Sequence, residues 1–141
     1  MAARFPLIVD GSGTPAIKEI VSGDVLDLTG LQVKLGTEAT LTDGATVAWD
    51  VSASPIAKLT LGGNRTLSAP TNAVGSGQYI SLLVIQDGTG SRTLTWNAAY
   101  EFTADTAPTL TTTASKGDLF TFRYNGSKWL EVGRNLNLTL S

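Results

Sequence analysis

The sequence predicts an all-β protein, and three observations support this prediction. Charged residues make up only 16% of the 141 residues, and the polar side chains are mainly Thr and Ser. Thr favours strands, while the 15 glycines favour the turns between them. No stretch shows a sustained helical period, whereas several stretches alternate between apolar and polar residues. The length and the 42% of hydrophobic residues suit one folded domain with a short extension.

The strongest strand pattern lies in residues 78–96. Its first half is the longest apolar run of the chain, as a buried strand requires. Asp87-Gly88-Thr89-Gly90 follows and suits a tight reversal, because Gly accepts positive φ. Leu94 and Trp96 then alternate with hydroxyl side chains. We therefore expect a central β-hairpin with one apolar face.

Further strand patterns follow from residue 40 onward at the spacing of a sandwich or barrel. They lie in residues 46–51, 56–61, 65–69, 100–102, 118–124 and 128–132. Asn125-Gly126 predicts a two-residue hairpin, because both residues tolerate the positive φ of a type I′ turn. Gly133 is expected to end the returning strand. The alternating leucines of residues 136–140 predict a separate tail strand that adds to a sheet edge.

Residues 1–36 differ from the rest, because their apolar pieces are short and broken by Gly and Pro. Such pieces cannot build a core alone, so we expect an N-terminal arm for attachment or assembly, followed by a β-sandwich domain in residues 37–141. Docking of the arm would need hydrogen-bonded strand addition, because chain ordering opposes most of the gain from apolar burial. The residues expected to carry the anchoring are Phe5, Leu7, Ile8 and Val9, supported by Ile17, Ile20 and Leu26.

Composition argues against several functions. The chain has no His and no Cys, which removes Ser-His and Cys-His catalysis and the usual zinc ligands. Its net charge is −2, and its Lys and Arg residues are scattered, so nucleic acid is not an expected partner. No apolar run approaches the ~20 residues that cross a bilayer, and the N-terminus does not resemble a signal peptide. We expect no catalytic residues, no cofactor, no metal and no membrane partner.

Three groups of residues are candidate sites. The Gly-rich turns at residues 11–13, 62–63 and 88–90 precede strand patterns, so they indicate turns and not phosphate loops. The carboxylates Glu101 and Asp105, like Asp24 and Asp27, are expected to be solvated loop charges and not a catalytic pair. The tryptophans Trp49, Trp96 and Trp129 are expected in the core, with an exposed aromatic platform for glycan as the alternative.

Residues 4–10, 17–28, 59–67, 86–96 and 124–129 together resemble a family of small bacteriophage virion proteins. The family includes capsid decoration (cement) proteins, neck and fibre proteins, and baseplate components. The resemblance implies a jelly-roll-like antiparallel β-sandwich with an extended N-terminal arm, usually in a trimer. It also implies that the N-terminal segment attaches to the particle, and it implies no catalytic residues.

On this basis the main hypothesis is a capsid decoration (cement) protein, made in the host cytoplasm and located on the capsid surface of the virion. It would form a homotrimer and stabilise the head by binding major capsid proteins. The alternative is a β-sandwich module attached to the tail, neck or fibre, which binds host glycan or another virion protein. The alternative predicts exposed aromatic residues around a shallow groove.

Overall fold

The computed structural model describes residues 7–9, 15–17 and 36–141, and the chain divides into two units, Met1–Val33 and Lys34–Ser141. In the first unit, β1 (Leu7–Val9) pairs with β2 (Pro15–Ile17) in antiparallel orientation. Four of the expected anchoring residues, Leu7, Ile8, Val9 and Ile17, lie in these two strands. The other three, Phe5, Ile20 and Leu26, lie outside the described residues.

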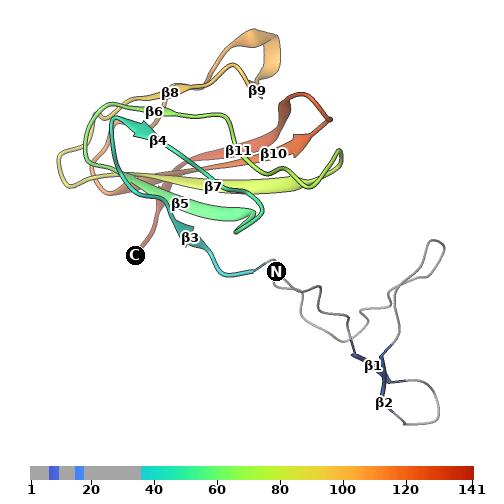
Figure 1. Cartoon of the computed structure of the whole chain (residues 1–141). Coiled ribbons are helices and arrows are strands. Elements are labelled where there is room, and N and C mark those ends of the chain that lie inside the picture. Colours follow the sequence, from blue (N-terminus) through green and yellow to red (C-terminus); the bar gives the residue numbers. More distant parts are fainter. Residues whose placement is uncertain (1–6, 10–14, 18–35) are drawn as a thin grey trace. The chain divides into compact units, whose positions relative to one another are not determined.

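The second unit contains two sheets (Figure 1). The six-stranded sheet has the order β3 (Ala39–Thr40), β5 (Ile56–Leu61), β7 (Tyr79–Gln86), β10 (Lys116–Tyr124), β11 (Trp129–Thr139) and β9 (Tyr100–Glu101). The three-stranded sheet has the order β4 (Thr46–Val47), β6 (Arg65–Leu67) and β8 (Leu94–Trp96). One short 3-10 turn, η1 (Thr103–Asp105), follows β9. No helix in the described part of the chain is long and apolar enough to cross a membrane.

From β3 to β8, successive strands alternate between the two sheets. Each strand then pairs in parallel with the strand two places earlier, so that β3, β5 and β7 stack in one sheet and β4, β6 and β8 in the other. The register places Thr46, Thr66 and Thr95 side by side across the three-stranded sheet. The chain therefore winds through successive coils in a β-solenoid-like arrangement (Figure 1).

The coils end in an antiparallel hairpin. β10 pairs with β7 on one side and with β11 on the other, both in antiparallel orientation. The turn between β10 and β11 contains Asn125-Gly126, and Gly126 has φ +102°. The Asn125 side chain accepts hydrogen bonds from the amides of Ser127 and Lys128, at 2.9 and 2.7 Å. The predicted hairpin is confirmed, but the type I′ turn is wrong, because Asn125 does not have positive φ and residues 125–128 separate the two strands.

The all-β class is confirmed, but the antiparallel jelly-roll expectation is not. Among the strands of residues 36–141, five pairings are parallel and two are antiparallel. The predicted central hairpin is wrong as well, because β7 and β8 lie in different sheets and β8 pairs in parallel with β6.

The physical reason lies in the connection between β7 and β8. The Gln86 side chain is buried, and it accepts a hydrogen bond from the Arg92 amide (2.8 Å) and donates one to the Arg92 carbonyl (2.9 Å). The Asp87 carboxylate accepts hydrogen bonds from the amides of Thr89 and Gly90. These contacts hold residues 86–92 as a corner that leads to the other sheet, and not as a two-strand reversal.

The expected end at Gly133 is also wrong, since β11 runs unbroken from Trp129 to Thr139. Two register shifts against β10 accommodate the extra residues, one between Thr121 and Phe122 and one between Gly117 and Leu119. The predicted tail strand is therefore the second half of β11, paired with β10 of its own chain.

The core lies between the two sheets. Side chains of the three-stranded sheet, including Val47 and Leu67, meet those of the six-stranded sheet, including Leu82, Phe120 and Phe122. Two of the three tryptophans are core residues as expected, since Trp49 is 1% exposed and Trp129 is 2% exposed. Trp96 is half-buried and packs against the core from its margin.

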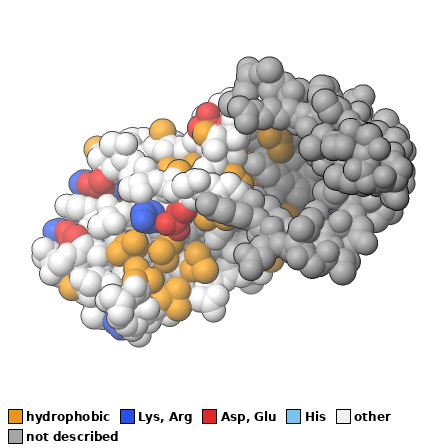
Figure 2. All heavy atoms as spheres, turned by 90° about the horizontal axis from the view of Figure 1, so that it is seen from below, with side chains coloured by type: hydrophobic (Ala, Val, Ile, Leu, Met, Phe, Trp, Pro, Cys, Tyr) orange, Lys and Arg blue, Asp and Glu red, His pale blue; other side chains and the backbone are white. Residues whose placement is uncertain are grey.

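The outer face of the six-stranded sheet carries a group of apolar side chains, beside polar ones such as Lys58 and Thr121. Its central strands place Leu83 opposite Leu119, and Gly117 pairs with both Ile85 and Leu138. A Cβ atom at Gly117 would lie only 2.9 Å from a Leu140 methyl carbon, so the absence of a side chain at Gly117 allows Leu140 to pack there. Figure 2 shows hydrophobic side chains gathered on one face of the domain. We call Leu83, Ile85, Leu119, Leu138 and Leu140 the outer apolar face.

Candidate functional site

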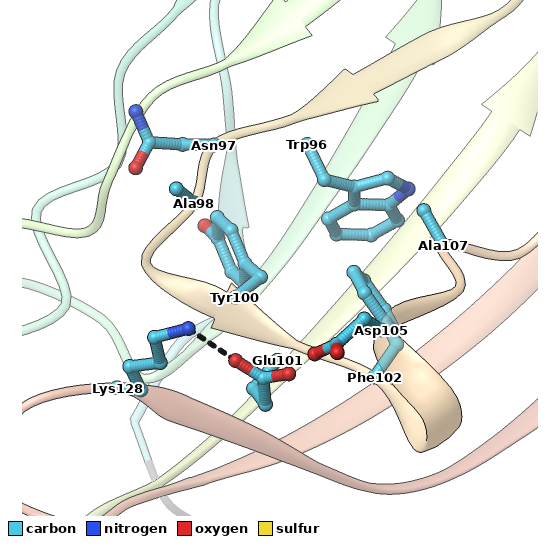
Figure 3. A pocket seen from close by; sticks show the side chains of 9 residues that line it. All are labelled: Trp96, Asn97, Ala98, Tyr100, Glu101, Phe102, Asp105, Ala107 and Lys128. Atoms are coloured by element: carbon cyan, nitrogen blue, oxygen red, sulfur yellow. Dashed lines mark hydrogen bonds and ion pairs between the residues drawn. The ribbon is translucent and has the colours of Figure 1, made fainter.

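A pocket of about 290 Å³ lies beside β8 and β9 (Figure 3). Aromatic side chains form part of its lining, and two carboxylates and one ammonium group form another part. We call it the aromatic–acid pocket. Its lining residues are Trp96, Asn97, Ala98, Tyr100, Glu101, Phe102, Asp105, Ala107 and Lys128.

Local sequence positions these side chains by alternation. In the segment from Tyr100 to Phe102, the two aromatic residues are buried and the intervening Glu101 is half-buried. Pairing of β9 with Trp129 and Leu130 of β11 fixes this segment to the six-stranded sheet. The Asn97 side chain accepts a hydrogen bond from the Ala99 amide at 2.9 Å and thereby shapes the turn that leads into β9.

Trp96 is the centre of the aromatic part of the pocket. Its ring makes edge contacts with Tyr100, Phe102 and Phe120, with ring centroids 5.3, 5.2 and 5.0 Å apart. Edge-to-face contacts of this kind contribute about 0.5–1.5 kcal/mol each beyond area burial. The surrounding rings therefore hold the Trp96 side chain in a fixed orientation at the pocket.

Two polar atoms of the aromatic wall have no hydrogen-bond partner among the described residues, namely Trp96 Nε1 and the Tyr100 hydroxyl. Tyr100 is only 4% exposed, and burial raises the pKa of its hydroxyl well above the usual value, so the group keeps its proton. A buried polar group without a partner costs about 1–3 kcal/mol. Both groups are donors, and their atoms are buried within the aromatic wall.

The polar part of the pocket is a pair of neighbouring carboxylates. Figure 3 shows the carboxyl groups of Glu101 and Asp105 pointing toward each other, with Lys128 on the other side of Glu101. Lys128 forms an ion pair with Glu101, which lowers the pKa of the Glu101 carboxyl. Hydrogen bonding to the Glu101 carboxylate raises the pKa of Asp105. A negative charge on Asp105 is therefore less favourable than on an isolated carboxyl, whereas Lys128 stabilises the charge on Glu101.

The backbone around Asp105 is strained. Ala104 and Asp105 have φ values of +54° and +52°, in the left-handed region that side-chain-bearing residues avoid. Two hydrogen bonds hold this turn, from the Asp105 amide to the Phe102 carbonyl (3.1 Å) and from the Thr106 amide to the Thr103 carbonyl (3.2 Å). The strained turn directs the Asp105 carboxyl toward Glu101.

The structure changes the interpretation of several predicted site residues. Glu101 and Asp105, expected to be solvated loop charges, lie together in a pocket with Trp96, which was expected in the core. Asp24 and Asp27 lie outside the described residues. Lys128 was not considered as a site residue, because it lies 27 positions from Glu101 and only the pairing of β9 with β11 brings them together. Of the expected anchoring residues, Leu7, Ile8, Val9 and Ile17 lie in β1 and β2 of the first unit, and the other three lie outside the described residues.

A second hollow of about 210 Å³ lies beside residues 91–94 and 108–112. Among the lining residues that the structure describes, Arg92 is the one charged residue, and it forms a 2.9 Å ion pair with Asp87. The described lining therefore offers no unpaired charged side chain to a ligand.

Comparison with known proteins gives one match. The model of a family described as "Putative phage tail fibre C-terminal domain" matches residues 37–129, which is more than half of the chain and includes every residue of the aromatic–acid pocket. No curated protein and no solved structure matches the chain. The chain therefore belongs to this family of phage tail fibre C-terminal domains and is a bacteriophage structural protein.

Proposed function

We propose that this chain is the receptor-contacting end of a phage tail fibre and that it binds a host-surface glycan in the aromatic–acid pocket. One observation carries this proposal: a rigid aromatic wall and a carboxylate pair line the same hollow. Sugars present apolar ring faces and hydroxyl groups, so they need both kinds of surface. Pockets that fix small ligands combine aromatic walls with a few placed polar groups in the same way.

The family match supports a position in the tail fibre over a position on the capsid surface. Decoration of the capsid by binding major capsid proteins, the main hypothesis from sequence, has no support from the pocket or from the match. The alternative, a fibre-attached module that binds host glycan, agrees with both. Residues 1–36 then serve to join the domain to the preceding part of the fibre or to another virion protein.

We also propose that the outer apolar face is where copies of this chain meet in a homotrimer. Obligate interfaces are more apolar than ordinary protein surface. Lys58, which pairs with Leu83 in the sheet, lies 3.4 Å from Glu38 in an ion pair, so its charge is offset beside this face. Sedimentation analysis should give a trimer at micromolar concentration, and Leu119→Asp should give a monomer. A wild-type monomer would remove this part of the proposal.

The proposed role is binding and not hydrolysis. Retaining glycosidases hold their two carboxyl groups about 5–5.5 Å apart, with the reacting sugar carbon between them. In this pocket the carboxyl groups of Glu101 and Asp105 point toward each other, and Lys128 engages Glu101 in an ion pair (Figure 3). Neither carboxyl is therefore placed as a separate acid or nucleophile.

The test is a survey of immobilised bacterial surface glycans with the full chain. At least one glycan should bind above background, and Glu101→Ala combined with Asp105→Ala should weaken that binding at least tenfold. Glu38→Gln is the matched control, because Glu38 also belongs to a lysine ion pair but lies outside the pocket. Absence of glycan binding, or binding that the double variant leaves unchanged, would refute the proposed function.

A further inference from the structure

The charges of the aromatic–acid pocket are unbalanced. Glu101 and Asp105 supply two carboxyl groups, and within the described part of the chain Lys128 is the one cationic residue of the lining. Lys128 forms its ion pair with Glu101. Asp105, which the strained backbone directs toward Glu101, has that carboxylate as its neighbour in place of a cation.

Resting on the proposed function, we propose that the pocket binds an amino sugar, with the ligand's ammonium group held between Glu101 and Asp105. An ammonium group has three donors and no acceptor, so it can bond both carboxylates at once. It also supplies the second positive charge that two ionised carboxylates require. A sugar with a carboxylate would instead bring a third negative charge beside them, which disfavours its binding.

The remaining features of the pocket fit the rest of such a ligand. A volume of about 290 Å³ lies at the lower end for ligand sites, which suits one sugar ring. The Trp96 side chain offers an apolar surface to the ring. The Glu101 carboxylate and the Lys128 ammonium group also line the pocket, and sugar hydroxyls can donate to the one and accept from the other.

The placement of the two acids explains what an ammonium group adds. Hydrogen bonding to Glu101 raises the pKa of Asp105, so a negative charge on Asp105 is less favourable beside Glu101 than on an isolated carboxyl. An ammonium group between the two carboxylates offsets this repulsion.

The experiment compares four methyl glycosides that differ in one substituent: glucosamine, glucose, N-acetylglucosamine and glucuronic acid. Binding to the full chain is titrated by NMR at neutral pH. We expect glucosamine to bind at least tenfold more tightly than glucuronic acid, with the two neutral sugars between them. Asp105→Asn should reduce the preference for glucosamine over glucose to less than threefold while glucose binding persists. Glu38→Gln should leave all four affinities unchanged.

Equal binding of all four sugars, tighter binding of glucuronic acid, or binding of none of them would overturn the amino-sugar assignment. The glycan survey tests the proposed function separately. If a surface glycan without amino groups binds through Glu101 and Asp105, the proposed function stands and this inference fails. Thermal unfolding of each variant checks that the fold is kept, which is expected because Asp105 is exposed.

Discussion

Replacing Asp118 with Ala should destabilise the domain more than any surface substitution. Asp118 is 2% exposed, and its carboxylate accepts three hydrogen bonds: from the Thr111 amide (2.7 Å), the Thr111 hydroxyl (2.7 Å) and the Asn137 amide (2.9 Å). These bonds join the 105–115 loop and the second half of β11 to β10. Hydrogen bonds to charged groups are worth about 1.5–3 kcal/mol each, and they are not additive. Allowing for relaxation, we expect a loss of about 3–5 kcal/mol in the free energy of unfolding.

Urea unfolding followed by far-UV circular dichroism measures this loss. Thr111→Val is the matched control, because it removes only the hydroxyl bond and should cost about 1 kcal/mol. In the double variant the Thr111 substitution should cost almost nothing, since its partner is already gone. If Asp118→Ala lost less than 1 kcal/mol, or if the two substitutions were additive, Asp118 would not hold the loop and strand together as described.

Three further predictions concern a turn, an ion pair and the pocket. Gly90 has φ +76°, and a side chain there would lie 2.5 Å from the Thr112 carbonyl oxygen, so Gly90→Ala should cost about 2 kcal/mol or more in urea unfolding; an unchanged midpoint would contradict this close approach. The Arg65 guanidinium lowers the pKa of Asp43 below its usual 3.8, so the stability from this pair is present above that pH and is lost as the pH falls through the folded-state pKa. The Asp43→Asn variant should therefore show a smaller drop in melting temperature than wild type between pH 6 and pH 3. Equal drops in the two proteins would refute this. Since Trp96 is the half-buried tryptophan, ligand binding should change the intrinsic fluorescence, and Trp96→Phe should abolish that change.

The sequence predicts strands better than it predicts their partners. Alternation placed strands at residues 56–61, 65–69 and 118–124, where the structure has β5, β6 and β10. Alternation only reports which side chains face the core, and it is the same for parallel and antiparallel neighbours. The corner after Gln86 contains the Asp and Gly residues of a tight hairpin turn, so the sequence pattern could not distinguish a coil corner from a reversal.

The candidate site was harder to predict, because it depends on pairings between distant strands. Glu101 and Asp105 are visible as neighbours in the sequence, but their environment is not. Trp96 lies in the three-stranded sheet, whereas Lys128 precedes a strand of the six-stranded sheet. Only the position of β9 beside β11 brings both residues to the two acids. No local pattern encodes that contact.

The position of the pocket follows from the way the coils end. β8 is the last strand of the three-stranded sheet, so the chain that follows it finds no further strand of that sheet to pair with. Instead it crosses to the six-stranded sheet, where β9 pairs in parallel with the beginning of β11. The crossing leaves Trp96 half-covered and places the 101–107 segment beside it, which forms the hollow. Under the proposed function, sequence change in this crossing alters the ligand while the coils, packed around Leu67 and Leu82, keep the fold. The proposed receptor contact benefits from this separation, because host surfaces vary while the fold has to be kept.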